Sequence, residues 1–80
     1  MEITEQAIRQ ILKNAAGRID FSQARPDDSL RKAGMDSMEI SNIMLEIEEA
    51  YGIKIPDGDL DGLDTIAAIV GYVREKMKGP

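Results

Sequence analysis

The 80-residue sequence contains no cysteine and no histidine, and both absences exclude classes of functional site. Without cysteine there is no disulfide, no thiolate nucleophile and no cysteine-based zinc site. Without histidine there is no Ser-His-Asp triad and no imidazole that titrates near neutral pH. The only aromatic residues are two tyrosines and one phenylalanine. A chain this short buries only about 60% of its unfolded surface, so we predict that it forms no catalytic cleft and is not an enzyme.

The net charge of −5 and the lack of a long apolar run restrict the kinds of binding partner and the cellular compartment that we expect. Nucleic acid is disfavoured because phosphate contacts need a basic face. The longest apolar run, residues 66–70, is much shorter than the roughly 20 residues that cross a membrane. Residues 1–5 lack the basic start and apolar stretch of a signal peptide. We therefore expect a cytoplasmic protein that neither binds nucleic acid nor spans a membrane.

The negative charge is concentrated between Asp36 and Asp64. This stretch has nine acidic residues and a single base, Lys54, for a net charge of −8. The rest of the chain has six acids and nine bases, which gives +3. Such a run is either a solvated face or a docking surface that attracts basic partners in a salt-sensitive way. The charge distribution alone leaves both alternatives open.

Apolar residues recur at helical spacing in three stretches, which predicts an all-α fold. We expect a small four-helix bundle, with three longer helices and one short helix, in a single domain of residues 1–80. The longer helices are expected over residues 4–16 and 37–51 and from Thr65 to Met77. The first two have good N-caps in Thr4 and Asp36 and natural stops in Gly17 and Gly52.

The connections between these helices are expected to differ in length and order. Residues 18–35 form a long loop, and a long loop in a compact domain needs apolar anchors. A short helical turn is expected near residues 28–33, and at most one turn over residues 57–63, which contain two glycines. Gly79 and Pro80 are expected to end the last helix. The candidate loop anchors are Ile19, Phe21, Leu30 and Met35.

The predicted helix over residues 37–51 has apolar residues on two opposite faces. One stripe is sufficient to dock the helix on a core. Met38 and Leu45 are seven residues apart and fall on the other face, among glutamates. They are either incidental surface hydrophobes or the apolar anchors of a partner-binding face with an acidic rim. The core stripe consists of Ile40, Ile43, Met44, Ile47 and Tyr51.

Ser37 is the first residue of that helix, directly after its N-cap Asp36. Both residue types are common at helix starts, so local structure is enough to explain them. A nucleophilic serine needs an adjacent base, and the chain has no histidine to provide one. A functional Ser37 is therefore expected to be modified rather than to catalyse. A phosphodiester there would lie near the free amides and positive end of the helix.

The segment Gly34-Met35-Asp36-Ser37-Met38 resembles the Gly-x-Asp-Ser-Leu/Met motif of acyl carrier proteins, whose serine bears a 4′-phosphopantetheine arm. Residues 45–52, 53–57 and 65–73 resemble further segments of that family, in the same order and spacing. The resemblance implies that Ser37 accepts the arm from coenzyme A through a phosphopantetheinyl transferase. It also implies that Asp36 helps to position the magnesium ion used in that transfer.

The same resemblance implies the function and the surfaces that serve it. The thiol of the arm would hold acyl intermediates as thioesters, for presentation to enzymes of fatty-acid, polyketide or related lipid biosynthesis. The carrier is expected to be a monomer. Partner enzymes with basic patches would contact Met38, Glu39, Leu45, Glu48 and Glu49. An acyl chain would slip between this helix and the next segment, against Met44, Ile47, Tyr51, Ile55, Leu60 and Leu63.

Some residues depart from the pattern of fatty-acid carriers. Ser41 and Asn42 stand where those carriers usually have an apolar residue and a glutamate. Met38 after the serine also occurs in D-alanyl carrier proteins. A dedicated pathway is therefore expected, and an aminoacyl (D-alanyl-type) or peptidyl carrier is the alternative within the class.

A second motif resembles a calcium-binding loop and indicates a different function. Asp57, Asp59, Asp61 and Gly62 fit positions 1, 3, 5 and 6 of an EF-hand loop. Position 12 should supply a bidentate glutamate and is Ala68. An EF-hand-like calcium-binding helical module that uses the three aspartates is the alternative outside the carrier class.

Overall fold

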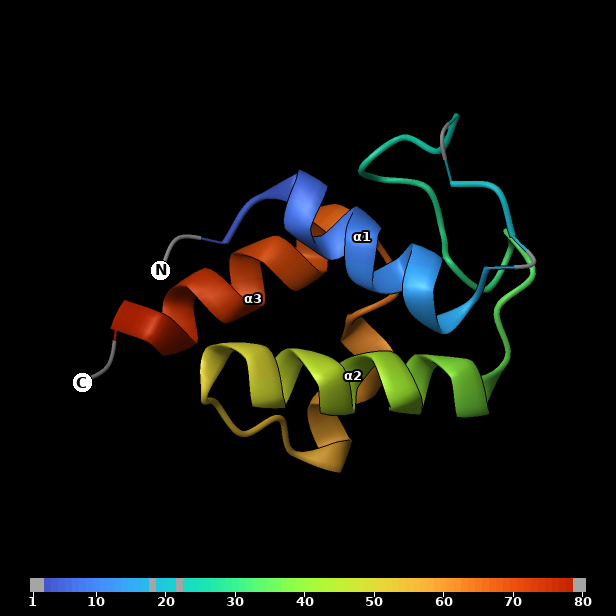
Figure 1. Ribbon diagram of the computed structural model, residues 1–80. Helices are drawn as coiled ribbons and strands as arrows, with labels where there is room; N and C mark the ends of the chain where they lie inside the picture. The colour runs from blue at the N-terminus through green and yellow to red at the C-terminus, as the bar shows by residue number, and fades with distance from the viewer. Residues whose placement is uncertain (1–2, 18, 22, 79–80) are drawn as a thin grey trace.

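The structure is a computed structural model that describes residues 3–17, 19–21 and 23–78. Within these ranges it is all-helical, with three longer helices and one short 3₁₀ helix, as predicted (Figure 1). The elements are α1 (Glu5–Ala15), α2 (Ser37–Tyr51), η1 (Asp57–Gly62) and α3 (Ile66–Lys78). The predicted stop at Gly79 and Pro80 lies outside the described residues.

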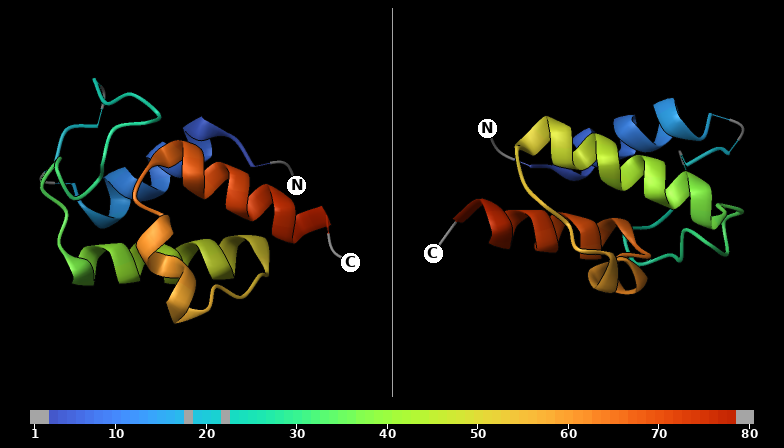
Figure 2. Two further views of the ribbon diagram at one scale, coloured as in Figure 1. Left: turned by 180° about the vertical axis from the view of Figure 1, so that it is seen from behind. Right: turned by 90° about the horizontal axis from the view of Figure 1, so that it is seen from below.

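The three α-helices pack into a bundle with η1 beside it. α1 contacts both α2 and α3. α2 runs antiparallel to α1, and α3 returns in the same general direction as α2 (Figures 1 and 2). The long connection between α1 and α2 loops out at the end of the bundle where α2 begins (Figure 1). In the part of the chain that is described, no helix has the length and apolar character of a membrane span.

Each α-helix turns an apolar stripe into a common core. The stripe of α2 is the one that periodicity predicts, with four of its five residues buried and Tyr51 half-buried. Met77, which periodicity places on the stripe of α3, is instead 38% exposed. The last turn of α3 projects beyond the other helices, so no core reaches Met77 (Figure 1). The buried helical residues are Ile8, Leu12, Ile40, Ile43, Met44, Ile47, Ile66, Ile69, Val70 and Val73.

The helix ends are fixed by local capping. The Thr4 side chain accepts a hydrogen bond from the Ala7 amide, which caps α1. At α2, Asp36 Oδ1 accepts from the Glu39 amide at 2.8 Å, and Glu39 Oε1 accepts from the Asp36 amide at 3.1 Å. These two bonds form a complete capping box. Gly52 ends α2 with φ = 66°, a left-handed conformation that favours glycine.

The long connection is held by the predicted apolar anchors and by a polar contact that was not predicted. The Arg9 guanidinium of α1 donates to the carbonyl oxygens of Phe21 and Ala24, both at 2.8 Å. The short helical turn expected near residues 28–33 is present as a single turn, in which the Ala33 amide donates to the Ser29 and Leu30 carbonyls, both at 3.1 Å. Of the anchors, Ile19 is half-buried, and the buried ones are Phe21, Leu30 and Met35.

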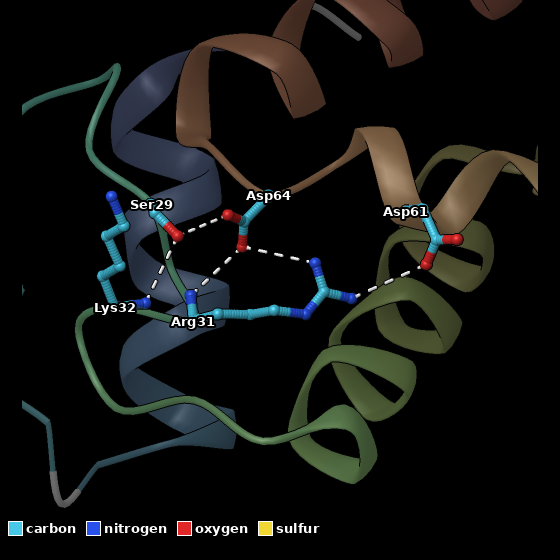
Figure 3. A network of polar contacts seen from close by, with 5 residues as sticks. All are labelled: Ser29, Arg31, Lys32, Asp61 and Asp64. Atoms are coloured by element: carbon cyan, nitrogen blue, oxygen red, sulfur yellow. Dashed lines mark hydrogen bonds and ion pairs between the residues drawn. The ribbon is translucent and has the colours of Figure 1, made fainter.

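Asp64 fastens this connection to the start of α3 (Figure 3). Its carboxylate accepts hydrogen bonds from the Ser29 hydroxyl and, at 3.1 Å, from the Arg31 amide. Its carbonyl oxygen accepts from the Leu30 amide at 2.7 Å. The Arg31 guanidinium lies 3.6 Å from the Asp64 carboxylate and 3.9 Å from that of Asp61. Asp64 therefore accepts hydrogen bonds from two amides at the start of the short turn in the connection.

Replacing Asp64 with alanine is expected to lower the free energy of unfolding by about 2 kcal/mol, because hydrogen bonds to a half-buried carboxylate are lost. Urea unfolding followed by circular dichroism measures this change. The matched control is Asp61→Ala, because the Asp61 side chain is 99% exposed and an exposed ion pair contributes less than about 1 kcal/mol. Equal losses in the two variants would contradict the clamping role of Asp64.

The segment before α3 is longer than the single helical turn that was expected. η1 has six residues, which is about two turns at 3.0 residues per turn. The prediction was wrong because a 3₁₀ helix needs only bonds between residues three apart. The Asp59 amide bonds to the Pro56 carbonyl at 2.9 Å, and the Leu63 amide to the Leu60 carbonyl at 3.0 Å. Gly58 and Gly62 do not prevent these contacts.

Candidate functional site at the start of helix α2

Ser37 is the first residue of α2, directly after the long connection, and its side chain is exposed. The backbone before Ser37 is constrained at two residues, Gly34 and Met35. Gly34 has φ = 114°, a conformation that L side chains rarely adopt. Met35 is buried, and its amide donates to the Leu30 carbonyl at 3.1 Å. The connection therefore presents Ser37 to solvent at a defined position.

The first turn of α2 suits an anion at Ser37. The capping box occupies the amides of Asp36 and Glu39. The amides of Ser37 and Met38 have no cap within the described chain, and they add to the positive end of the helix. The Ser37 hydroxyl also makes no hydrogen bond to any residue that the structure describes. An exposed, unengaged hydroxyl beside uncapped amides fits a phosphodiester attachment.

The outer face of α2 exposes the two apolar residues that the sequence singled out. Met38 is 73% exposed and Leu45 is 56% exposed. The glutamates around them differ. Glu49 is exposed, whereas Glu39 is half-buried in the capping box. Glu48 is also half-buried, and its Oε2 accepts from the Ile55 amide at 2.7 Å. The face that the sequence predicted to be exposed is exposed at Met38, Leu45 and Glu49, whereas Glu39 and Glu48 also form hydrogen bonds within the chain.

The inner face of α2 and the segment after it bring together the residues predicted to line an acyl pocket. They all belong to the hydrophobic core or pack against it. Tyr51 and Leu60 are half-buried and pack against it. The fully buried members are Met44, Ile47, Ile55 and Leu63.

The three aspartates of the calcium alternative do not form a loop around one point. They lie along η1, where Asp59 accepts a hydrogen bond from the Tyr72 hydroxyl at 2.6 Å. Asp61 is directed to Arg31 (Figure 3). Across the described stretches of the chain, no group of three or more acidic side chains is placed to hold a metal ion.

A solvent-open groove of about 490 Å³ lies away from Ser37, between α1 and the start of the long connection. None of its lining residues belongs to the predicted site, so the groove is not evidence for that site. The lining residues are Gln6, Arg9, Gln10, Lys13, Gly17, Ile19, Asp20 and Phe21.

Tyr72 of α3 has a shifted acidity that sequence reasoning missed. Desolvation, followed by the hydrogen bond to Asp59 and the charges of Asp59 and Glu48, raises the pKa of Tyr72 to about 12 from 10.0. The folded state therefore favours the protonated phenol more than the unfolded state does. This contribution to stability is complete below pH 10 and is lost as the pH rises from 10 to 12.

Tyr72→Phe is expected to remove this pH dependence. The difference in unfolding free energy between wild type and Tyr72→Phe should be largest at pH 9 and should shrink toward pH 12. Urea unfolding at a series of pH values measures it. A difference that stays constant across this range would show that the phenol titrates alike in both states.

Comparison with known proteins agrees with these features. Residues 6–73 match the family model described as the phosphopantetheine attachment site. The chain is 32% identical over 80 residues to the meromycolate extension acyl carrier protein of Mycobacterium tuberculosis, which covers 94% of this chain and 69% of that protein. It is 34% identical over 71 residues to the acyl carrier protein of Rubrobacter xylanophilus, over 88% of this chain and 86% of that one.

A solved structure shows the same fold. The hexanoyl form of the carrier protein from the actinorhodin polyketide synthase of Streptomyces coelicolor superimposes with a TM-score of 0.85. The alignment covers 98% of this chain and 94% of that chain, at 23% identity. The chain therefore belongs to the acyl carrier protein family, whose members carry acyl groups on a covalently attached phosphopantetheine.

Proposed function

We propose that Ser37 is the residue that bears the phosphopantetheine. The observation that carries this proposal is the exposed, unengaged Ser37 hydroxyl, which lies in the first turn of α2 beside the two amides, of Ser37 and Met38, that the capping box leaves free. The attached group supplies the thiol that holds the cargo as a thioester. The chain itself supplies a fixed attachment point, an exposed docking face and an apolar interior.

The cargo that we propose is an acyl intermediate of fatty-acid, polyketide or related lipid biosynthesis in a dedicated pathway. The names of the relatives support an acyl cargo over an aminoacyl one, since the meromycolate extension and Rubrobacter proteins are both acyl carriers. We further propose that residues 1–80 act as one monomeric carrier domain in the cytoplasm. Its partners would be a phosphopantetheinyl transferase and enzymes with basic patches.

Incubation with coenzyme A, magnesium and a broad-specificity transferase tests the attachment. Intact-mass spectrometry should show a gain of one phosphopantetheinyl group. Trypsin cleaves after Lys32 and Lys54, so the added mass should appear on the peptide of residues 33–54. Failure of the folded chain to gain the group, or a gain on another peptide, would overturn the assignment.

Asp36 is proposed to have two roles, as the N-cap of α2 and in positioning the magnesium ion during transfer. Asp36→Asn separates them, because asparagine caps helices as well as aspartate does but carries no charge for the metal. The variant should keep the wild-type unfolding free energy and lose at least about tenfold in transfer rate. An unchanged rate at limiting magnesium would leave Asp36 with the capping role alone.

We propose that the outer face of α2, with Met38, Leu45 and Glu49 as its exposed members, docks partner enzymes. Glu39 and Glu48 would add negative charge at its edges while keeping their intramolecular bonds. The pairing of apolar anchors with an acidic rim supports this proposal. A steep fall of the transfer rate with rising salt would agree with it, since salt screens steering between charged surfaces.

The inner face of α2 is proposed to shelter the acyl chain beside Met44, Ile47, Tyr51, Ile55, Leu60 and Leu63. These side chains belong to one hydrophobic core or pack against it, which supports the proposal. Amide spectra of the octanoyl-loaded and unloaded protein test it. An absence of shifts at these residues on loading would reject sheltering in the interior.

A further inference from the structure

η1 is held to the bundle more by polar contacts than by buried side chains. None of the six residues Asp57–Gly62, all of which the structure describes, is buried, and Leu60 is only half-buried. The hydroxyl of Tyr72 on α3 donates to Asp59 Oδ2 at 2.6 Å. A segment with few buried apolar contacts opens locally at a lower cost than the whole fold. The few contacts that hold η1 therefore determine how often it opens.

The other polar contacts near η1 are weaker or do not reach it. Arg31 lies 3.9 Å from Asp61, whose side chain is 99% exposed, and such a pair contributes little. The bond between Glu48 and the Ile55 amide holds the strand-like segment before η1 and not η1 itself. The hydrogen bond from Tyr72 to a carboxylate is short and charge-assisted, which makes it the strongest side-chain contact described for η1.

Tyr72 on α3 connects that helix to η1. Its hydroxyl contacts η1, and the charges of Asp59 on η1 and Glu48 on α2 both act on it. The Lys76 ammonium group lies over its ring, 5.4 Å from the centroid, on the same helix. The phenol is protonated at neutral pH and donates its hydrogen to Asp59. Tyr72 thus ties η1 to α3 at the edge of the core.

We propose that Tyr72 is a latch that holds η1 closed and sets how often an acyl chain beneath η1 becomes accessible. This inference rests on the proposed function, because only a carrier loaded with acyl cargo has a chain to shelter. The contact that holds η1 is a hydrogen bond between exposed groups, and no residue of η1 is buried. Opening of η1 therefore breaks this bond and leaves the hydrophobic core packed.

Amide hydrogen exchange of the unloaded protein tests the latch directly. In Tyr72→Phe, the Asp59 and Leu63 amides should exchange about 5- to 30-fold faster, because one charge-assisted hydrogen bond is lost. The amides of α1 should keep their wild-type rates. Asp59→Ala should give the same acceleration, and the double variant should add nothing further, since both changes remove one bond.

The matched control is Asp61→Ala, which removes another carboxylate of η1, one that is 99% exposed and pairs with Arg31 rather than with a residue of α3. It should leave the exchange of the Asp59 and Leu63 amides unchanged. An equal acceleration of η1 and α1 in Tyr72→Phe would mean general destabilisation and would overturn the latch. Unchanged rates in η1 would overturn it as well.

Cleavage of a loaded chain tests the link to the cargo. Wild type and Tyr72→Phe are loaded from octanoyl-coenzyme A by the transferase and then treated with hydroxylamine, which cleaves the thioester. Cleavage of Tyr72→Phe should be faster by the same factor as its η1 amide exchange. Equal cleavage rates would overturn the proposal, because η1 would then not cover the chain. Failure to load at all would reject Ser37 as the attachment site and leave the exchange result to decide on the latch.

Discussion

Ser37→Ala is expected to abolish the mass gain from coenzyme A completely, because alanine has no oxygen to form the phosphodiester. The loss should not come from unfolding. Ser37 is exposed, the N-cap of α2 is supplied by Asp36, and alanine is the best helix former. Intact-mass spectrometry gives the modified fraction, and thermal unfolding checks that the fold is retained.

Ser41→Ala is the matched control. Ser41 is also exposed, lies one turn further along α2 on the same side, and falls on the same tryptic peptide as Ser37. Its hydroxyl is outside the first turn, away from the uncapped amides. The Ser41→Ala variant should therefore be modified at the wild-type rate. Modification of the Ser37→Ala chain, or loss of modification in Ser41→Ala, would reassign the attachment site.

The start of α2 was predictable because the signals that define it are local. An N-cap at Asp36, a glutamate three residues later and an apolar stripe at helical spacing act over a few residues and set the first residue of the helix at Ser37. The same holds for the end at Gly52, where the left-handed conformation needs only a glycine in place. Local signals therefore predicted where the candidate attachment residue lies.

The contacts that hold the long connection and η1 were not predictable in this way. Asp64 bonds to Ser29, which is 35 residues away in the sequence, and Tyr72 bonds to Asp59 across two elements. Neither pair has a spacing that implies contact, because each depends on the path of the intervening chain. The length of η1 was missed for a related reason, since glycines argue against an α-helix more strongly than against a short 3₁₀ helix.

Glu39 and Glu48 of the acidic rim both form hydrogen bonds within the chain, and only the bond of Glu39 was predictable from the sequence. The spacing of Asp36 and Glu39 already indicates a capping box, and that box holds part of the Glu39 carboxylate within the chain. The bond from Ile55 to Glu48 depends on how the chain turns back after Gly52. Helical periodicity places Glu48 and Glu49 on the same docking face. It therefore does not show that Glu49 is exposed while Glu48 is half-buried.

The double variant Met38→Ala/Leu45→Ala is expected to lower kcat/KM for transfer of the arm by at least about 30-fold. An apolar anchor at the centre of an interface typically contributes about 2 kcal/mol when it is a hot spot, and 1.4 kcal/mol corresponds to tenfold in affinity. Stability should not fall, because both side chains are mostly exposed and alanine favours the helix. Single-variant rates would show how the loss divides between Met38 and Leu45.

Met77→Ala is the matched control for that variant, because it removes an exposed apolar side chain, 38% accessible, from the far end of α3. Its transfer rate should equal that of the wild type. If the double variant on α2 is modified as fast as the wild type, Met38 and Leu45 are incidental surface hydrophobes. A loss in the double variant that Met77→Ala does not share would instead identify Met38 and Leu45 as the apolar anchors of the surface that docks the transferase.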